Sequence, residues 1–381
     1  MLLGVPTEIK ANENRVGLVP SSVREVIAHG HRVVVESGAG AGVDFSDDAY
    51  REAGAEVVDS AAEVFERAEM IVKVKEPQPS ETPLLRPEQI LFTFLHLAPD
   101  PEQTTALQRS GCTAIAYETV TSDRGTLPLL APMSEVAGRL SIQAGARCLE
   151  KIMGGRGVLM GGVPGVGPAR VCILGGGVAG SNALRMATGM GAEVTVLDKN
   201  LMRLAELDDQ YGGRIKTWYS TEESVEQAVL EADVVIGTVL LPGAAAPKLI
   251  KRDMVRRMKA GSVIVDVSVD QGGCSETTRA TTHQDPTYVV DDVVHYCVAN
   301  IPGAVARTST MALNHATLPF VLKLADNGVW PALHADPHLR NGLNVCCGYV
   351  TIRAVAEHLD REYRDPQDLV NNGKGPATEA A

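Results

Sequence analysis

Short runs of apolar residues recur along the chain, separated by stretches in which apolar residues return at every third or fourth position. The short runs predict buried strands, and the spaced pattern predicts amphipathic helices. In the first third of the chain we expect strands in GVPTEI, HRVVVE, MIVKVK, LFTFLHL and CTAIAYET. Between the first two, SSVREVIAHG predicts a helix that begins at a capping serine and ends at Gly30. This alternation is typical of α/β proteins with parallel sheets.

A second series of the same kind follows a long helical segment. SEVAGRLSIQAGARCLEKIM, residues 134–153, predicts an amphipathic helix with Ser134 as its N-cap, long enough to connect two domains. The Gly- and Pro-rich segment GGRGVLMGGVPGVGPA comes next, a composition that is common at domain boundaries. Six predicted strands then follow, the number in a complete dinucleotide-binding fold: RVCIL, VTVLD, RIKTWY, DVVIGTV, SVIVDV and VVHYCV. From about residue 306 the pattern is helical.

A chain of 381 residues exceeds what one hydrophobic core usually supports, so two domains are expected. We predict an α/β protein with two Rossmann-like, doubly wound parallel-sheet domains, separated by a cleft and joined by the long helix. The first domain is predicted to be discontinuous, with residues 1–128 and 306–381, because the helical C-terminal part returns to it. Residues 129–305 form the second domain.

Charge and composition exclude several classes of protein. The net charge of -12 argues against binding to nucleic acid or anionic lipid, which needs clustered Lys and Arg. No apolar run reaches the roughly 18 residues of a membrane span, and MLLGVPTEIK lacks the pattern of a signal peptide. The seven cysteines show no CxxC spacing, so we expect neither disulfides nor a metal site, and a cytoplasmic location. The tandem Cys346 and Cys347 are interpreted as small buried apolar residues.

The segment GGGVAG carries the pattern GxGxxG through Gly175, Gly177 and Gly180. It follows the apolar strand VCIL and precedes a predicted helix, and Asp198 ends the next strand about 20 residues downstream, as a dinucleotide-binding fingerprint requires. Gly175 permits the tight turn, Gly177 lets the backbone approach a pyrophosphate, and Gly180 allows helix and strand to pack closely. Asp198 would accept hydrogen bonds from the adenosine ribose, which favours NAD over NADP. Lys199 and Arg203 keep NADP open as the cofactor, because either cation could reach its 2′-phosphate.

Polar residues also follow several of the predicted strands, where ligands of such folds bind. In the second domain the residues just past the strand ends are Ser220, Val239, Leu240, Asp270 and Asn300, of which Ser220, Asp270 and Asn300 are polar. Asp266, which is still within its strand, is interpreted as structural, with hydrogen bonds to backbone or to a neighbouring loop. Asp270 lies past the end of that strand and is compatible with either a loop residue or a catalytic carboxylate.

In the first domain, Lys73 and Lys75 close one apolar strand, His96 closes another, and Arg15 follows the first. A histidine in such a place is more often a hydrogen-bonded core residue than a catalyst. Three such ionisable groups at strand ends, together with Arg15, nevertheless predict a polar site at this edge of the sheet. Imidazole is suited to proton transfer near neutral pH, and Arg can clamp a carboxylate with two hydrogen bonds.

Together these stretches resemble the alanine dehydrogenase family, which includes the NAD(H)-binding subunit of the proton-translocating transhydrogenase. The similarity extends to about residue 360 and is carried by GVPTEIKANENRVGLVP, KVKEP, FTFLHLA, AYETV, LLAPMSEVAGR, GGVPGV, ILGGGVAGSNA, VDVSVDQGGC, TTHQDPTY, HYCVANIPGAV and RTSTMALNHATLP. It implies that the chain interconverts L-alanine with pyruvate and ammonia, using NAD. It also implies a homo-oligomer, a hexamer in this family.

The resemblance assigns roles to individual residues. It implies that Arg15 and Lys75 bind the carboxylate and carbonyl side of the substrate in the first domain, and that His96 and Asp270 are the acid/base pair. The second domain would bind NAD through a larger set: Ser134, Gly175, Gly177, Gly180, Asp198, Arg203, Ser220, Val239, Leu240, Val298 and Asn300.

Three alternatives remain at this point. The chain could be a transhydrogenase-like NAD(H)-binding subunit without an amino-acid pocket, although Arg15, Lys75 and His96 occur together. It could act on another small amino acid, such as glycine. It could also bind a nucleotide as a sensor without catalysis.

Overall fold

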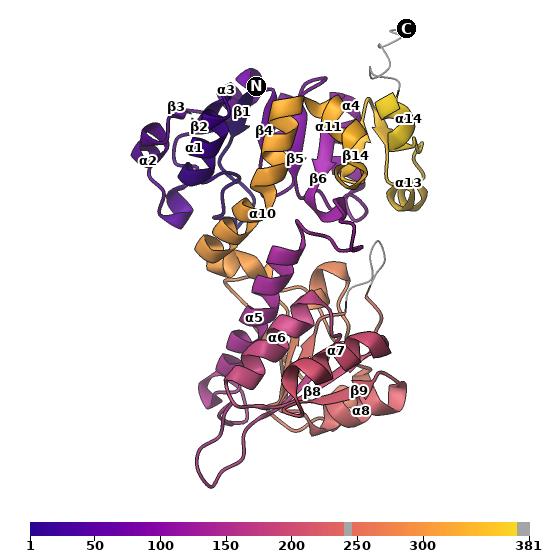
Figure 1. Ribbon diagram of the computed structural model, residues 1–381. Coiled ribbons are helices and arrows are strands. Elements are labelled where there is room, and N and C mark those ends of the chain that lie inside the picture. Colours follow the sequence, from indigo (N-terminus) through magenta and orange to yellow (C-terminus); the bar gives the residue numbers. More distant parts are fainter. Residues whose placement is uncertain (240–245, 372–381) are drawn as a thin grey trace. The chain divides into compact units, whose positions relative to one another are not determined.

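The computed structural model describes residues 1–239 and 246–371, and the chain passes twice between two units (Figure 1). Unit 1 contains Met1–Pro132 and the segment from Val305 onward, and unit 2 contains Met133–Ala304. The first passage falls near the start of helix α5 (Ala131–Cys148), and the second falls just before helix α10 (Ala306–Asn327).

The described part of unit 1 contains an eight-stranded sheet in the order β3-β2-β1-β4-β5-β6-β14-β15. The first six strands are parallel and follow the 3-2-1-4-5-6 order of doubly wound folds, whereas β14 and β15 add an antiparallel edge. The strands are β1 (Leu2–Val5), β2 (Arg32–Glu36), β3 (Glu56–Val58), β4 (Met70–Val72), β5 (Ile90–Thr93), β6 (Thr113–Ala116), β14 (Leu343–Cys346) and β15 (Tyr349–Val350).

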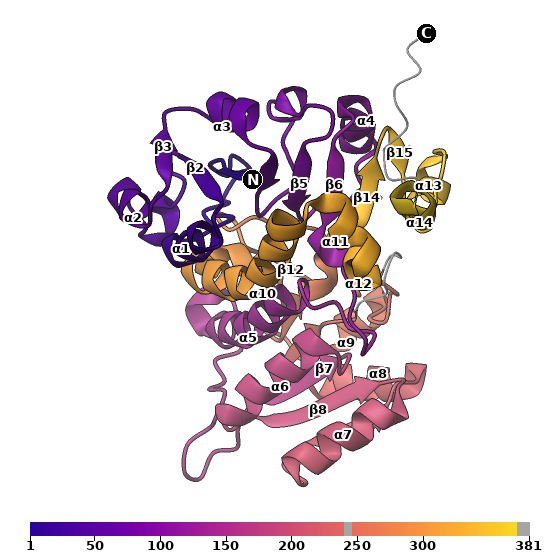
Figure 2. The same cartoon turned by 45° about the horizontal axis from the view of Figure 1, so that its top comes forward.

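Helices cover the sheet of unit 1 because their apolar residues pack against those of the strands. Val64 and Phe65 of α3 and Leu107 of α4 share a buried cluster with Leu91 and Ala114 of the strands. Helices α10 and α11 run across the sheet in Figures 1 and 2. The helices of this unit are α1 (Pro20–Ala28), α2 (Asp47–Glu52), α3 (Ala61–Arg67), α4 (Pro101–Ser110), α10, α11 (Val329–Ala335), α12 (Pro337–Arg340), α13 (Arg353–Leu359) and α14 (Pro366–Asn371).

The described part of unit 2 contains a seven-stranded sheet in the order β12-β13-β11-β10-β7-β8-β9. Its six parallel strands again follow the 3-2-1-4-5-6 order, and β12 pairs with β13 in the antiparallel direction at the edge. The strands are β7 (Arg170–Leu174), β8 (Glu193–Asp198), β9 (Lys216–Tyr219), β10 (Val234–Gly237), β11 (Val263–Asp266), β12 (Thr287–Val290) and β13 (Val293–Tyr296).

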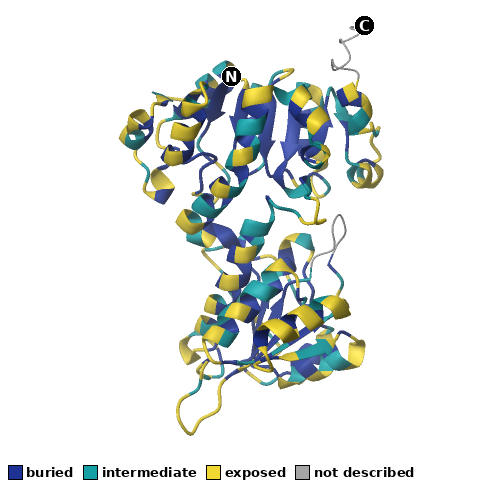
Figure 3. Cartoon of the chain, in the orientation of Figure 1, coloured by how far each residue is buried: buried dark blue, intermediate teal, exposed yellow. Residues whose placement is uncertain are grey.

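Both faces of this sheet are buried, which explains why its strands are continuous apolar runs. Alternate side chains point to opposite faces, so Val171 and Ile173 pack with helices α6 and α7, whereas Cys172 and Leu174 pack with α8 and α9. The inner strands of both sheets accordingly appear dark blue in Figure 3. The helices are α5, α6 (Val178–Gly189), α7 (Leu201–Tyr211), α8 (Glu222–Glu231) and α9 (Arg252–Arg257).

The predicted fold class is confirmed, with three corrections of detail. Helix α1 begins at Pro20, and its N-cap Val19 makes no side-chain capping bond, so the predicted serine cap is wrong. Ser134 lies within α5 and is not its N-cap, because Pro132 lets the helix begin earlier, at Ala131. The sheets are mixed and not purely parallel, because β12, β14 and β15 pair in the antiparallel direction at their edges. The sequence analysis did not predict these three strands.

No helix within residues 1–239 and 246–371 is long and apolar enough to cross a membrane.

Candidate active site

Lys75 and His96 follow neighbouring strands at the carboxyl edge of the sheet in unit 1. Strands β4 and β5 pair in parallel, and they remain hydrogen-bonded past their ends, where the Phe94 N–H donates to the Val74 carbonyl oxygen at 3.2 Å. In a doubly wound sheet this edge is where ligands bind. The strand register therefore places the predicted lysine and histidine side by side at such an edge.

Arg15 reaches the same edge through a close contact between backbones. A Cβ atom on Gly17 would lie 2.2 Å from the carbonyl oxygen of Val72, so only glycine lets this segment lie against the end of β4. Arg15 is buried, and its Nε and Nη2 atoms donate to the two carboxylate oxygens of Glu13 at 2.7 and 2.6 Å. This two-point pairing fixes the orientation of the guanidinium group.

Lys73 is a structural residue. Its ammonium group is fully buried and lies 3.3 Å from Glu8 and 2.7 Å from Glu81. Burial alone lowers the pKa of Lys73, but the two carboxylates outweigh it and hold the pKa above its usual value. Burial also raises the pKa of Glu8, and Lys73 partly offsets that effect. The carbonyl oxygen of Lys75 accepts a hydrogen bond from Thr93 Oγ1 at 2.8 Å.

His96 is not a core histidine, because 46% of its side chain is exposed. Its φ of 49° lies in the left-handed region, which non-glycine residues seldom adopt. The carboxylate of Glu118 accepts the His96 N–H at 2.6 Å and the Leu95 N–H at 3.2 Å, and it lies 3.7 Å from His96 Nδ1. The ring also stacks on Phe94, with 5.7 Å between ring centroids. Glu118 and Phe94 thus hold an exposed imidazole in place at the sheet edge.

The Gly-rich turn of unit 2 lies between β7 and α6, at the switch point of the sheet. Gly175 has a φ of 101°, and a Cβ on Gly180 would lie 1.8 Å from the Gly175 carbonyl oxygen, so the fold itself requires glycine at both positions. A Cβ on Gly177, by contrast, would meet nothing within 4 Å. The protein's own packing thus leaves open space at Gly177, where the fingerprint brings a pyrophosphate close to the backbone.

Asp198 and Arg203 brace this turn from the next strand and helix. The Asp198 carboxylate accepts the Gly176 N–H at 2.6 Å and the Asn200 N–H at 2.8 Å. Arg203 Nε donates to the Gly176 carbonyl oxygen at 2.8 Å, and its Nη1 pairs with Glu206. The Arg203 guanidinium is therefore already bound to the turn that it was expected to border.

The other predicted cofactor residues lie in unit 2 at several places. Ser220 is buried after β9, and its N–H donates to the Asp198 carbonyl oxygen at 3.0 Å. The carbonyl oxygen of Val239 accepts from Ser268 Oγ at 2.8 Å. Val298 is buried, and Ser134 is half-buried on α5. Leu240 lies outside the described residues.

Asp270 is exposed and follows β11 on a short 3-10 turn, Val267–Gln271. The Asn300 N–H points to its carboxylate at 3.3 Å, and Asn300 itself has a φ of 57° in the left-handed region. The Asn300 carbonyl oxygen lies 3.3 Å from Nε2 of His283. Both backbone groups of Asn300 are thus tied, one to Asp270 and one to His283.

Asp266 is structural, as predicted. Its carboxylate is buried and accepts hydrogen bonds from Ser268 N–H at 3.0 Å, Cys274 N–H at 2.8 Å and Thr278 Oγ1 at 2.6 Å. These bonds shape the loop that carries Asp270, because they close both ends of it.

Comparison with known proteins identifies the family. The family models "Alanine dehydrogenase/PNT, N-terminal domain" and "Alanine dehydrogenase/PNT, C-terminal domain" match residues 4–137 and 141–353. The chain belongs to the alanine dehydrogenase/PNT family. Alanine dehydrogenase of Halomonas elongata is 58% identical over 370 residues, covering 97% of this chain and 100% of the relative. That of Bacillus subtilis is 54% identical over 364 residues, covering 95% and 96%.

Solved structures agree with this membership of the alanine dehydrogenase/PNT family. An L-alanine dehydrogenase structure superposes with a TM-score of 0.91 at 54% identity, covering 94% of this chain and 99% of the other. A transhydrogenase from Sinorhizobium meliloti superposes with a TM-score of 0.78 at 25% identity, covering 93% and 100%.

Alanine dehydrogenases use NAD, and the turn of unit 2 fits that cofactor. Gly175 and Gly180 form the tight turn, Gly177 leaves room next to the backbone, and the N-terminus of the 12-residue helix α6 faces the same place. The Asp198 carboxylate stands at the end of β8, the position from which a ribose is bound in such folds.

The sequence analysis missed two residues that contact the predicted site residues His96 and Asn300. Glu118 lies in the quoted stretch AYETV, and a carboxylate that follows an apolar strand could have been recognised by the rule that singled out His96. His283 lies in TTHQDPTY, within a loop and away from any strand end, so its contact with Asn300 had no signal in the sequence.

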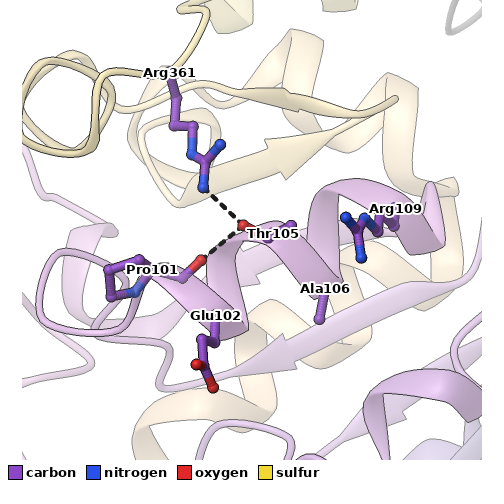
Figure 4. Close-up of a pocket in the computed structure, with 6 residues that line it drawn as sticks. All are labelled: Pro101, Glu102, Thr105, Ala106, Arg109 and Arg361. Atoms are coloured by element: carbon purple, nitrogen blue, oxygen red, sulfur yellow. Dashed lines mark hydrogen bonds between the residues drawn. The ribbon is translucent and has the colours of Figure 1, made fainter.

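A shallow pocket on unit 1 lies apart from these residues (Figure 4). It is lined by residues of α4 and by Arg361, which donates to Thr105 Oγ1 at 2.8 Å. None of the predicted site residues lines it, and we assign it no role in the family's chemistry.

We predict that His283→Ala lowers kcat about three- to tenfold, the change in rate that corresponds to the loss of one hydrogen bond. The KM for NAD should change little. The imidazole holds the Asn300 backbone, which in turn contacts Asp270. His283→Gln, which can keep a donor near the same place, should recover most of the loss. Steady-state kinetics of both variants would measure the effect, and equal kcat values for His283→Ala and the wild type would contradict it.

Proposed function

We propose that this chain is an NAD-dependent L-alanine dehydrogenase (EC 1.4.1.1), which converts L-alanine, NAD and water into pyruvate, ammonium, NADH and a proton. The observation that carries the proposal is the group of Arg15, Lys75 and His96 at one sheet edge of a chain 58% identical to an alanine dehydrogenase over nearly its full length. Unit 1 is proposed as the substrate domain, and unit 2 as the NAD-binding domain.

The residues of unit 1 have the chemistry that an amino or 2-oxo acid requires. Arg15 is proposed to bind the substrate carboxylate, because its guanidinium is buried and held in one orientation by Glu13. Lys75, a compact cation, is proposed to polarise the carbonyl oxygen of pyruvate in the reverse direction. Both cations sit at an edge where the fold already buries charge, so a small anion would find a prepared environment.

His96 is proposed as the main proton carrier. Oxidation of L-alanine requires the amine to lose a proton, water to add to the resulting imine, and ammonia to leave with a proton. An exposed imidazole held by Glu118 can accept and return those protons without leaving its place. Asp270 is proposed to orient the amine or the water and to offset the positive charge of the iminium form. His96 belongs to unit 1 and Asp270 belongs to unit 2.

Bound NAD supplies the acceptor for the hydride that leaves the Cα atom of the substrate. The proposed NAD-binding residues are Gly175, Gly177, Gly180, Asp198, Arg203, Ser220, Val239, Val298 and Asn300, with Ser134 on α5 and Leu240. Arg203 is proposed to act indirectly, by holding the Gly176 carbonyl oxygen and thereby the shape of the turn.

The test is an assay of the purified chain with L-alanine and NAD at alkaline pH, following NADH by absorbance. We expect NADH only when amino acid is present, with L-alanine preferred in a panel that includes glycine and L-serine. In the reverse direction, pyruvate and ammonia should consume NADH. A transhydrogenase-like subunit would show no amino-acid dependence, and a sensor would bind NAD without turnover.

Cofactor choice gives a separate prediction. Asp198→Ala should raise the KM for NAD about 10- to 100-fold, since a hydrogen bond to a charged group contributes about 1.5–3 kcal/mol. The same substitution should reduce the preference for NAD over NADP. Asp198→Asn, which keeps one acceptor oxygen, should lie between. The exposed Asp209 on α7 provides a control, because Asp209→Ala should leave both cofactors unaffected. If the ratio of kcat/KM with NAD to kcat/KM with NADP is unchanged in Asp198→Ala, Asp198 does not select the cofactor.

We further propose a cytoplasmic homo-oligomer, a hexamer by family resemblance, that binds neither nucleic acid nor membrane. The net charge of -12 supports the last part. Exposed apolar residues on unit 2, among them Leu159, Val163 and Val166, support self-association. Light scattering coupled to gel filtration would measure the mass of the assembly.

A further inference from the structure

A tight hairpin turn joins β14 and β15, with Cys347 and Gly348 as its two central residues. Their φ angles are 51° and 82°, the pattern of a type I′ turn, in which Asn and Gly are the favoured pair. A cysteine is an unusual residue in the left-handed region. The turn is also tied to α4, because Gln108 Nε2 donates to the Gly348 carbonyl oxygen at 2.8 Å.

The turn brings two thiols together. The Sγ atoms of Cys346 and Cys347 are 3.3 Å apart, and Thr113 Oγ1 lies 3.9 Å from Cys346 Sγ. All seven cysteines of the chain are described, and Cys347 differs from the other six because it is not buried. The expectation that both tandem cysteines are buried apolar residues is therefore wrong for Cys347, since the turn carries its side chain towards the surface.

The environment favours a thiolate at Cys347. The hydrogen bond with Cys346 lowers the pKa of Cys347 to about 7, although partial burial and Glu88 act in the opposite direction. Burial raises the pKa of the Cys112 and Cys148 thiols to about 11, so they remain protonated at neutral pH. The thiolate is the reactive form of cysteine.

We propose that Cys346 and Cys347 form a vicinal dithiol site for a thiophilic acceptor that bridges two sulfur atoms, the class to which trivalent arsenicals belong. With an arsenoxide, R–As=O, the Cys347 sulfur forms the first As–S bond and the Cys346 sulfur the second. The two thiol protons leave with the oxo oxygen as water. Arsenic keeps its oxidation state, so no oxidant or reductant takes part.

Bridging by one atom suits this pair better than a direct disulfide. Consecutive Cα atoms are about 3.8 Å apart across a trans peptide, whereas disulfides usually span about 4.4–6.8 Å. An acceptor atom between the sulfurs needs no such span, and the Sγ atoms, 3.3 Å apart, are close enough for one atom to bond both. The site lies in unit 1 on β14 and its turn, and it is independent of the proposed dehydrogenase chemistry.

The experiment uses the full-length chain, reduced and then freed of reductant, with phenylarsine oxide as the probe and intact mass as the readout. We expect one arsenical per chain at equimolar probe, removed by excess 1,2-ethanedithiol. Cys346→Ser and Cys347→Asn should each lower retention at least tenfold, whereas Cys148→Ser should retain it fully. Asparagine is chosen at 347 because it tolerates the left-handed backbone, so the hairpin should persist.

A second measurement separates the dithiol from a single reactive thiol. Iodoacetamide at neutral pH should label Cys347 at least tenfold faster than the buried cysteines, and Cys346→Ala should slow that labelling because alanine cannot donate the hydrogen bond. Equal arsenical retention by Cys347→Asn and the wild type, or no retention by the wild type, would overturn the proposal.

Discussion

Replacing His96 by asparagine should lower kcat for alanine oxidation by about 10²- to 10⁴-fold, the usual contribution of a positioned acid/base group. Asparagine is the sharpest substitution, because His96 has a φ of 49° and asparagine tolerates that region while it cannot carry a proton at neutral pH. The KM for NAD should stay near its original value, since the proposed cofactor residues belong to unit 2.

The measurement is a pH profile of kcat together with NAD binding. The exposed His334 on α11 offers a matched control, and His334→Asn should behave like the wild type. A His96→Asn variant with more than a tenth of the original kcat would exclude His96 as the main proton carrier.

Lys73→Met should destabilise unit 1 by about 3–5 kcal/mol. Lys73 is fully buried between Glu8 and Glu81, and its removal leaves two buried carboxylates without a cation. Lys10→Met is the matched control: Lys10 pairs with Glu76 but 40% of its side chain is exposed, so its loss should cost less than about 1 kcal/mol. Thermal and urea unfolding followed by circular dichroism would compare the two.

A rescue experiment distinguishes two causes of the lost stability in Lys73→Met, namely uncompensated buried charge and lost packing. Adding Glu8→Gln and Glu81→Gln to Lys73→Met removes the uncompensated carboxylates, so part of the stability should return. If the triple variant is no more stable than Lys73→Met, the loss arises from packing of the lysine stem and the electrostatic explanation fails.

Much of the fold followed from local patterns because both sheets are buried on two faces. Strands such as RVCIL and SVIVDV are continuous apolar runs, and the GxGxxG turn is governed by backbone geometry at Gly175 and Gly180. Asp266 was recognised as structural for a similar reason, since a carboxylate inside a buried strand must find donors nearby. Short edge strands such as β12 and β15 were missed because their pairing is antiparallel and half-exposed.

The candidate site was predicted less completely. Strand ends pointed to His96 and Asp270, and the same reasoning could have included Glu118. It could not separate Lys73 from Lys75, because residues two apart in an extended segment face the same side. Only the ion pairs with the buried Glu8 and Glu81 show that Lys73 is structural. His283 and the paired thiols at Cys346 and Cys347 depend on loop conformation, which carries no periodic signal.

The sequence by itself determined the fold class, the Gly-rich turn and the family, because periodicity, glycine geometry and motif spacing are properties of short segments. Only the tertiary structure decided which polar residues meet: Glu118 with His96, and Asn300 between Asp270 and His283. The physical reason is that strand register and turn conformation bring together groups far apart in the chain, and hydrogen bonds and ion pairs act only over a few ångströms.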